Sequence, residues 1–546
     1  MTEMARMPHG STPGREDAAA GVPETPAGDR PLGVGDALRV ALRDHGGREA
    51  LVGRHARYSF AELERAIEAA AAALCSFGVA PGDRIAATAR NDADIVIAFH
   101  AVQRLGAIWV GVARQLSPDE RAYQLGNSGA RYYLADEQSA RQVETVRHVL
   151  PELERVIGME PGDPASEWRA LLARFDGQPR ERREIDPYAP AVIGYTSGTT
   201  GFPKGVVHSQ YNMMVATAAD DVSRIERQAC VMQLTTMNVM MNHGLGCLRH
   251  GITLICVDRA DAGGILEWVE REGIEGFRAP PPVIHDLLTK AEFAAAGLSG
   301  LRYLATAGAG ASRRLRALYE QRFGRPMLDG YGLTEAPGAV TRFAPGDRPD
   351  ENAIGRPLAQ YELAILDMAG RELPAGEVGE ICVRARSSGP LAGVYRPMLG
   401  YWRNPEASAA VLKGGWLHTG DLGHVREDGM VFLSARRTDM ILRGGANVYP
   451  REIERVLEEL PGVRTAIALG LPDDRLGEIV AAAVEHEAGI DAGLLRNLLV
   501  ETATARLAKY KVPVVWLISE ALPRNSMGKV DRRRLRQAVL AAASQT

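Results

Sequence analysis

The sequence predicts an α/β fold followed by a smaller α+β unit, and three observations lead to this prediction. From about residue 33, segments with helical periodicity alternate with short apolar runs, the pattern of helices packed on largely parallel strands. From about residue 421, short strand-like pieces surround a charged turn, and enough chain follows for a compact unit of about one hundred residues. The 546 residues, 46% of them hydrophobic, can form a large core shared by more than one domain.

The elements of the large unit follow in order from these patterns. Residues 1–32 are rich in Pro, Gly and Ala and lack the apolar stretch of a signal peptide, so we expect a disordered tail. Residues 61–77 and 93–105 carry helical patterns, and each precedes a short apolar strand. The strands expected in this unit are residues 84–89, 107–112, 131–134, 192–195, 253–257 and 302–306.

The second unit is predicted from shorter elements. Its expected elements are strands at 429–433 and 440–442, a helix at 450–460, strands at 466–469 and 479–484, a helix at 492–507 and a strand at 514–518. The charged turn at 436–439 is the best candidate for a hinge. We therefore expect domains at 33–436 and 440–546, joined by a hinge at 437–439.

Composition excludes several classes of protein. A formal net charge of −4 and an isoelectric point near 6.4 argue against a nucleic-acid partner held by bulk charge. The five cysteines have neither a C-x-x-C pair nor the spacing of metal ligands, so we expect reduced core residues. The apolar runs are too short to span a bilayer, and we expect a cytoplasmic protein.

The run YTSGTTGFPKG at residues 195–205 is the most informative motif. Its glycines let backbone N–H groups approach an anion, its hydroxyls add donors, and Lys204 adds a positive charge. A kinase-type P-loop would need glycine immediately before the lysine and Ser or Thr after it, but the neighbours are Pro203 and Gly205. Taken alone, such a run also fits an ordinary turn. The other motifs favour phosphate binding.

Four further segments combine glycine with charged or aromatic side chains. LDGYGLTE at 328–335 places a tyrosine, a threonine and a carboxylate on one predicted loop, and WLHTGD at 416–421 ends a predicted loop in an aspartate. ILRGGANVYPREIE at 441–454 is a glycine turn that leads into a helix. PRNSMGKVDRRR at 523–534 presents a lysine on a turn before the last helix.

With the early run GVAPGDRIAATARND, these five motifs resemble, in content and order, the adenylate-forming acyl-CoA synthetase superfamily, which includes firefly luciferase and the adenylation domains of peptide synthetases. The resemblance extends from about residue 35 to about residue 540. It implies a large N-terminal domain of mixed sheets flanked by helices and a small mobile α+β C-terminal domain. It also implies two half-reactions: a carboxylate attacks the α-phosphate of ATP to give acyl-AMP and pyrophosphate, and a thiol then displaces AMP.

The resemblance further implies roles for individual residues. Thr334 would bind the α-phosphate, Glu335 would bind Mg²⁺, and Lys529 would be the catalytic lysine that bridges the attacking carboxylate and the α-phosphate. The remaining implied nucleotide and CoA contacts are Thr196, Ser197, Gly198, Thr199, Thr200, Gly201 and Lys204 at the β- and γ-phosphates; Gly308, Ala309, Asp329, Gly330 and Tyr331 around the adenine; Asp421 and Arg436 at the ribose; and Gly444 and Gly445 beside the pantetheine tunnel.

The implied acid site is apolar. Its candidate residues are Met237, Met240, Met241, His243, Gly308 and Gly310, which suggest a bulky hydrophobic or alicyclic acid. The sequence departs from many relatives here, because the aromatic–histidine pair expected near Thr235 and Thr236 is missing. Arg278 or Arg342 could instead pair with a second carboxylate of a dicarboxylic acid.

We therefore expect an acid–CoA ligase that uses ATP, Mg²⁺ and coenzyme A. A stand-alone ligase is favoured over a peptide-synthetase module because few residues follow the second unit. Three alternatives stay open: a half-reaction enzyme that uses supplied acyl-AMP, a ligase that loads a carrier protein, and an inactive nucleotide-binding scaffold. Thr438, where relatives commonly carry Asp or Lys, hints at the half-reaction enzyme. We expect no nucleic-acid partner, and a homodimer is compatible with these features.

Overall fold

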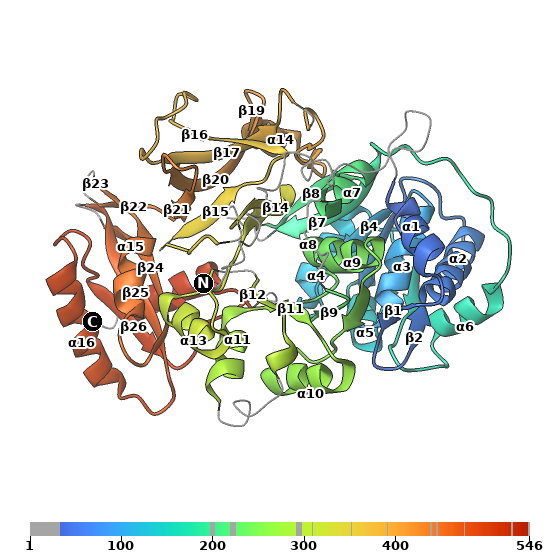
Figure 1. The fold of residues 1–546 in the computed structure, drawn as a ribbon, viewed down its shortest axis with the longest axis horizontal. Helices are drawn as coiled ribbons and strands as arrows, with labels where there is room; N and C mark the ends of the chain where they lie inside the picture. The colour runs from blue at the N-terminus through green and yellow to red at the C-terminus, as the bar shows by residue number, and fades with distance from the viewer. Residues whose placement is uncertain are drawn as a thin grey trace, which may run out of the picture.

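The computed structural model describes most of the chain, and the described residues are 33–196, 202–218, 225–290, 298–307, 310–344, 346–350, 352–389, 391–436, 439–443, 446–473, 476–525 and 528–543. The predicted tail at 1–32 and hinge residues 437 and 438 lie outside them. Strands of the described segments form four sheets, and helices flank them (Figure 1). The expected mixed α/β class is confirmed.

Two sheets with mostly parallel strands come first. One has the order β12-β11-β9-β10-β1-β2, in which only β2 is antiparallel to its neighbour. Its strands are β1 (Glu49–Val52), β2 (Arg57–Ser59), β9 (Arg227–Cys230), β10 (Thr253–Cys256), β11 (Gly276–Ala279) and β12 (Tyr303–Thr306).

The other has the order β18-β8-β7-β4-β3-β5-β6, and antiparallel pairing is confined to β7, β8 and β18. Its strands are β3 (Arg84–Thr88), β4 (Ile108–Gly111), β5 (Tyr132–Ala135), β6 (Arg155–Gly158), β7 (Pro190–Thr196), β8 (Lys204–Ser209) and β18 (Gly400–Tyr401).

Helices α2 (Phe60–Ser76) and α3 (Ala93–Arg104) share one hydrophobic core with strands of both sheets. Every residue of α3 from Ala93 to Gln103 is buried, including the polar Asp94, His100 and Gln103. The other α-helices described before residue 330 are α1 (Arg39–His45), α4 (Pro118–Ser128), α5 (Glu137–Thr145), α6 (Glu167–Phe175), α7 (Gln210–Ala218), α8 (Met237–Val239), α9 (Gly246–Arg249), α10 (Ala262–Glu272), α11 (Pro281–Thr289) and α13 (Arg313–Phe323).

A third, antiparallel sheet follows, in the order β13-β14-β15-β21-β20-β17-β16, with β19 beside β20. Its strands are β13 (Tyr331–Leu333), β14 (Ala336–Arg342), β15 (Ala353–Pro357), β16 (Tyr361–Leu366), β17 (Gly379–Ala385), β19 (Leu412–Lys413), β20 (Trp416–Val425) and β21 (Val431–Arg436), and α14 (Pro405–Val411) lies beside it.

Two predictions about this sheet were wrong. Residues 416–421 are part of strand β20, and residues 331–333 form β13, although both segments were expected as loops. In β20 the buried Leu417 and His418 pair with Val383 and Cys382 of β17. The Gly, Thr and Asp that are typical of turns are tolerated because this partner strand supplies the hydrogen bonds and burial.

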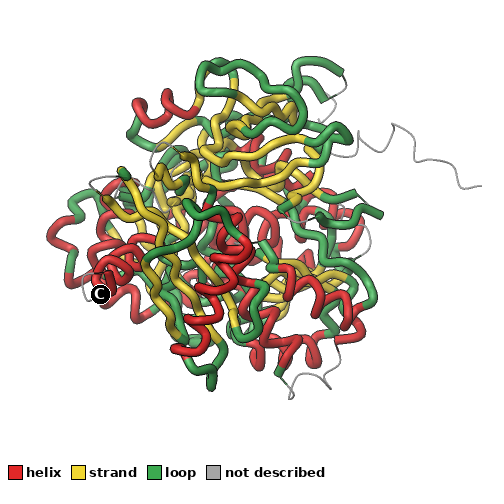
Figure 2. The backbone as a smooth tube through the Cα atoms, turned by 90° about the vertical axis from the view of Figure 1, so that its left-hand side faces the viewer, coloured by secondary structure: helices red, strands yellow, loops and turns green. Residues whose placement is uncertain are grey.

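The last sheet, β23-β22-β25-β24 with β26 beside β25, belongs to the C-terminal unit. Its strands are β22 (Ile441–Arg443), β23 (Ala446–Val448), β24 (Val463–Asp473), β25 (Gly477–His486) and β26 (Val515–Ser519). Its helices are α15 (Pro450–Glu458), α16 (Ala492–Arg506) and α17 (Arg532–Ala543). Figure 2 views the molecule from the side on which this unit lies. The strand expected near residues 429–433 belongs instead to the third sheet, as β21.

Two ion pairs join the C-terminal unit to helix α13. Arg313 lies 3.5 Å from Glu459, and Arg314 lies 2.9 Å from Glu487. All five cysteines are free thiols, as expected, and four of them are buried. Among the described residues, no helix is both long and apolar enough to cross a membrane.

Candidate active site

Strands β7 and β8 flank the glycine- and threonine-rich motif. They pair in antiparallel register, with Thr196 opposite Lys204, and the Thr196 hydroxyl donates to the Lys204 carbonyl over 3.4 Å. The structure thus places the flanks of the motif at the end of a hairpin where the chain connects β7 to β8. The intervening residues Ser197, Gly198, Thr199, Thr200 and Gly201 lie outside the described residues.

Lys204 is next to an aromatic ring of the neighbouring strand. Its Nζ lies 5.1 Å from the ring centroid of Tyr401, within the range of a cation–π contact. Tyr401 belongs to β18, which pairs with β8. Lys204 also lines a pocket of about 160 Å³ together with Tyr123, Phe202 and Trp402.

Thr334 and Glu335 form the connection between β13 and β14. The Tyr401 hydroxyl donates to Glu335 Oε1 over 2.9 Å, so one of the two carboxylate oxygens is held by the protein. The ring of His208 contacts the Thr334 carbonyl through Nε2 at 2.7 Å. Because a carbonyl only accepts, Nε2 carries the proton. Burial lowers the pKa of His208 to about 4, so this ring is neutral near pH 7.

The expected ribose and adenine residues meet across the third sheet. Tyr331 donates through its hydroxyl to Asp421 Oδ2 at 2.5 Å, and Asp421 is only 3% exposed. Asp421 on β20 pairs in register with Arg436 on β21, so the two candidate ribose ligands are cross-strand neighbours. The side chain of Arg436 lies outside the described set.

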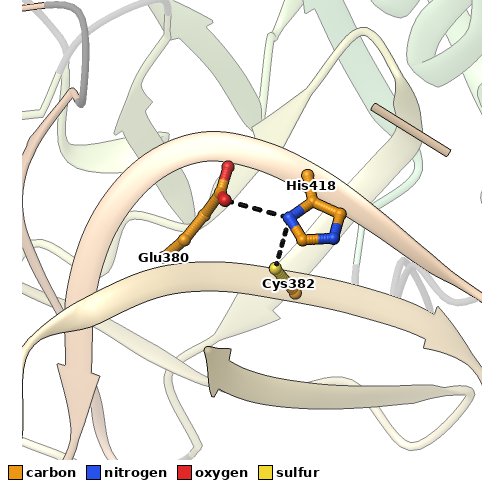
Figure 3. Close-up of side chains that lie close together, drawn as sticks. All are labelled: Glu380, Cys382 and His418. Atoms are coloured by element: carbon orange, nitrogen blue, oxygen red, sulfur yellow. Dashed lines mark hydrogen bonds and ion pairs between the residues drawn. The ribbon is translucent and has the colours of Figure 1, made fainter. Parts of the chain in front are cut away.

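A buried carboxylate supports the strand that carries Asp421 (Figure 3). Glu380 on β17 accepts from His418 Nδ1 over 2.9 Å and from the backbone N–H of Gly420 over 3.0 Å. The thiol of Cys382 lies 3.4 Å from the same histidine nitrogen. A tetrahedral zinc site would separate its nitrogen and oxygen ligands by about 3.3 Å. Since the observed nitrogen–oxygen separation is shorter, we interpret the cluster as a hydrogen-bonded group.

Asp329 holds the described residues on both sides of two candidate adenine contacts. Its carboxylate accepts from the backbone N–H groups of Thr306 and Ala311, over 3.2 and 3.4 Å, and from Arg316 over 2.9 Å. Gly308 and Ala309, between these two donors, lie outside the described residues. At the next position, Gly330, a Cβ atom would lie 2.9 Å from the Thr341 carbonyl oxygen, and this close approach explains the glycine.

The methionine-rich segment is buried and packs onto the β7–β8 hairpin, which is the candidate phosphate hairpin. Helix α8 continues directly into a π-helical turn, η4 (Met240–Leu245), a form of helix that is rare and often occurs at functional sites. A Cβ atom at Gly194 of β7 would lie only 2.8 Å from the Cβ of Met237, so this methionine packs directly on the strand that ends at Thr196. Three further candidates, Met240, Met241 and His243, are also buried.

The remaining acid-site candidates lie elsewhere. Gly310 is exposed, with no atom within 4 Å of a Cβ at its position. Arg278 lies on β11, with its guanidinium 5.3 Å from the ring centroid of Tyr303, and Arg342 ends β14.

Lys529 lies on a turn of the C-terminal unit. Asn525 holds this turn: its backbone N–H donates to the Lys529 carbonyl over 2.7 Å, and its side chain accepts from the Lys529 N–H over 3.1 Å. A Cβ at Gly528 would lie 3.7 Å from Pro280, which directly follows β11 of the large unit. The lysine is exposed and its turn faces the large unit. Gly444 and Gly445, between β22 and β23, are outside the described part of the chain.

Comparison with known proteins identifies the family. The family model of AMP-binding enzymes matches residues 38–402, and the model of the AMP-binding enzyme C-terminal domain matches residues 452–529. The chain belongs to the adenylate-forming acyl-CoA synthetase superfamily. The matched regions contain the early run and the motifs at 195–205 and 328–335, and they include Lys529 of the last motif.

Individual relatives support the same activity. The chain is 31% identical to an indoleacetate–CoA ligase of Aromatoleum aromaticum, over 88% of this chain and 93% of the relative. It is 32% identical to an octahydroindenyl-propanoyl:CoA ligase of Mycobacterium tuberculosis, over 92% of this chain and 97% of the relative. A solved structure of the anthranilate CoA ligase AuaEII with anthranoyl-AMP is 26% identical and has a TM-score of 0.85, covering 95% of this chain and all 100% of that one.

The protein is therefore an ATP-dependent, AMP-forming acyl-CoA synthetase that works through an acyl-AMP. Three residues that support the candidate site were not singled out from the sequence. Tyr401 contacts Glu335 and His208 contacts Thr334, while Glu380 holds the strand that carries Asp421. Tyr401 lies in the run GYWRNPEAS, where only the Asn-Pro helix start is a recognisable local signal. The directions of these side chains depend on strand pairing between distant segments.

Proposed function

We propose that this acyl-CoA synthetase activates a bulky hydrophobic or alicyclic carboxylic acid and transfers the acyl group to coenzyme A. The observation that carries this proposal is the packing of Met237 on β7, which links the methionine-rich segment to the phosphate hairpin. Methionine side chains adapt to irregular apolar ligands. Two relatives, named for indoleacetate and for an octahydroindenyl propanoyl group, act on ring-containing acids.

The residues around the nucleotide suit ATP and Mg²⁺. Glu335 offers a carboxylate oxygen of the kind that Mg²⁺ prefers, and we infer that it holds the ion, which neutralises phosphate charge when bound. Lys204 and the loop at 196–201 would hold the β- and γ-phosphates, and Thr334 the α-phosphate. Asp421 and Arg436 would bind the ribose, with Tyr331, Asp329, Gly330, Gly308 and Ala309 around the adenine.

Lys529 would hold the attacking carboxylate and the α-phosphate together during adenylation. The neighbourhood of Gly528 and Pro280 supports this role, because it brings the lysine turn to the large unit. We infer domains at 33–436 and 440–546 with a hinge at 437–439. Rotation about this hinge would move Lys529 away and bring Gly444 and Gly445 to the pantetheine tunnel for thioester formation.

A mixed panel of carboxylic acids tests the proposal. All assays would contain ATP and Mg²⁺, and AMP release would be measured under three conditions. The thiol acceptor would be coenzyme A, a holo-carrier protein, or absent. We expect ring-containing apolar acids to give sustained AMP release only with coenzyme A. A preference for dicarboxylic acids would contradict the proposal and favour Arg278 or Arg342 as a carboxylate partner.

Two other outcomes would identify a different acceptor or a partial reaction. Turnover with the holo-carrier alone would make the protein a carrier ligase, like the fatty acid–acyl-carrier-protein ligase of Streptomyces coeruleorubidus, which is 31% identical. Conversion of supplied acyl-AMP to acyl-CoA without adenylation of any acid would make it a half-reaction enzyme.

A further inference from the structure

We propose that Tyr401 is a positioning residue for adenylation, which orients Glu335 through its hydroxyl and Lys204 through its ring. One side chain thereby fixes the relative positions of the carboxylate that would hold Mg²⁺ and the ammonium that would hold phosphate. This inference rests on the proposed roles of Glu335 and Lys204, and goes beyond them by assigning the residue that holds both.

The hydroxyl contact is a charge-assisted hydrogen bond. Tyr401 donates to Glu335 Oε1 over 2.9 Å, in a part-buried position. A phenolic hydroxyl is protonated near neutral pH and a carboxylate only accepts, so Tyr401 is the donor in this bond. Hydrogen bonds to a charged group are about twice as strong as neutral ones. The bond restricts the rotation of the Glu335 carboxylate without using its second oxygen.

The ring contact involves the other charged group. Lys204 Nζ lies 5.1 Å from the ring centroid, close enough for attraction between the cation and the π-electrons. Lysine has a long flexible stem, and its ammonium loses entropy when phosphate fixes it. A ring that holds the ammonium beforehand reduces this loss when the nucleotide binds.

The backbone of Tyr401 is fixed from two sides. Strand β18 pairs with β8, where Tyr401 lies opposite Val206, two residues after Lys204. The Tyr401 N–H also donates to the Ser408 hydroxyl over 2.8 Å. Gly400 has φ of +141°, and a Cβ there would lie 3.0 Å from the Ser408 Oγ. Tyr401 thus lies on a strand whose position is fixed without any ligand.

Another tyrosine of the same segment provides a matched control. Tyr395 is buried, and its ring packs on that of Tyr361 with centroids 3.9 Å apart. Its surroundings belong to the hydrophobic core of the third sheet. Removal of its hydroxyl therefore tests for a general effect of a Tyr→Phe change near the site.

The test measures equilibrium binding of α,β-methylene ATP, a non-hydrolysable analogue, by calorimetry with Mg²⁺ and with EDTA. The ratio of the two affinities is the Mg²⁺-dependent gain. Tyr401→Phe keeps the ring, so we expect its gain to fall about tenfold while its affinity in EDTA changes less than about twofold. Tyr401→Leu also removes the ring, and we expect its affinity in EDTA to fall a further threefold or so.

Controls separate this inference from the proposed function. Glu335→Gln should lose the Mg²⁺-dependent gain, and adding Tyr401→Phe to it should change the gain little, since both act through one carboxylate. A full gain in Glu335→Gln would contradict the metal assignment itself. Loss of the gain in Glu335→Gln but not in Tyr401→Phe would overturn only the role of Tyr401.

An equal loss of the Mg²⁺-dependent gain in Tyr395→Phe and in Tyr401→Phe would also overturn the positioning role of Tyr401. AMP lacks the β- and γ-phosphates, so its affinity reports an intact nucleotide site. We expect that affinity to be retained in all of these variants. If Tyr401→Phe lost AMP binding to the same extent as analogue binding, Tyr401 would have a general structural role and the inference would be wrong.

Discussion

The carboxylate of Glu380 shows how one buried side chain can orient a candidate ligand-binding residue that it does not touch. It accepts from His418 and from the Gly420 N–H, so it ties β17 to the segment that ends in Asp421. The Asp421 N–H in turn donates to the Thr419 hydroxyl over 3.1 Å. These bonds fix the backbone from which the candidate ribose ligand projects.

Glu380→Gln should therefore weaken the binding of both ATP and AMP. A glutamine has one acceptor oxygen for two donors, so either His418 or the Gly420 N–H loses a partner at a cost of about 1–3 kcal/mol. We expect a loss of affinity of about tenfold for both nucleotides, because both contain the ribose. Calorimetry on purified variants would measure it.

Glu377→Gln, an exposed change close to the start of the same strand, serves as the control and should bind normally. A weaker binding of ATP alone in Glu380→Gln would place the effect at the phosphates and contradict the ribose interpretation. Unchanged affinity for both nucleotides would mean that Asp421 is positioned without Glu380.

Single residues of the site differ in how far the sequence predicts them. Lys204, Glu335 and Asp421 lie in motifs whose local composition is already unusual. Tyr401 and Glu380 lie in ordinary strand sequence, and they gain their roles only because β18 pairs with β8 and β17 pairs with β20. Such pairings join residues far apart in the chain, which local patterns do not encode.

The helices and strands also differ in how well local sequence predicts them. The alternation of helices and strands correctly predicted β3, β4, β5, β7, β10 and β12, but it missed other parallel strands such as β1, β6, β9 and β11. Helices α15 and α16 begin at the predicted residues. The antiparallel third sheet was only partly anticipated, because glycine, threonine and aspartate in β20 are typical of turns. Cross-strand pairing with β17 outweighs this local preference.

Helix α13 contacts the C-terminal unit through ion pairs, and these give a prediction for the balance of the two half-reactions. Arg314 and Glu487 are 2.9 Å apart and partly exposed. Arg314→Glu replaces their attraction with repulsion and should destabilise the observed arrangement. Exposed pairs contribute only about 0–1 kcal/mol, so we expect adenylation to slow about two- to fivefold. Thioester formation from supplied acyl-AMP should not slow.

The exchanged pair Arg314→Glu with Glu487→Arg is the matched control, since it restores opposite charges and should recover most of the adenylation rate. The two rates would be followed separately, as pyrophosphate release and as acyl-CoA formation. An equal fall of both rates in Arg314→Glu would contradict a role for this pair in one arrangement of the domains.

At the scale of the whole molecule, buried neutral histidines make stability depend on pH. His100 on α3 contacts the Gly244 carbonyl through Nε2 at 2.8 Å, and burial lowers its pKa to about 4. In the unfolded chain its pKa is about 6.5, so the unfolded state takes up the proton first as the pH falls. The free energy of unfolding should then decrease by about 2 kcal/mol between pH 7 and pH 5 because of this residue.

His100→Gln removes this titration while leaving an amide that can donate to the same carbonyl. Urea unfolding at pH 7 and pH 5 would measure the difference. We expect the decrease in the free energy of unfolding to be about 2 kcal/mol smaller in His100→Gln than in the wild type. His148→Gln changes an exposed histidine and should behave like the wild type. If the free energy of unfolding decreased equally in all three proteins, His100 would take up its proton in the folded state as readily as in the unfolded state.

The separation of the two half-reactions is the property that most depends on the whole chain, and Lys529 tests it. Its turn faces the large unit in this structure, where it would stabilise the charge that develops at the α-phosphate. Lys529→Ala should depress acyl-AMP formation by about two to three orders of magnitude. Conversion of supplied acyl-AMP to acyl-CoA should survive, because the lysine has no role in the attack by the thiol.

The exposed Lys509→Ala, in the same unit, should leave both steps unchanged. Pyrophosphate release, measured with the acid that the panel identifies, reports the first step, and thioester formation from the synthetic adenylate reports the second. A Lys529→Ala variant that adenylates normally would remove this residue from the mechanism. If a folded Lys529→Ala variant lost both steps, the lysine would be needed in both half-reactions. Its turn would then stay at the active site when the domains change their arrangement.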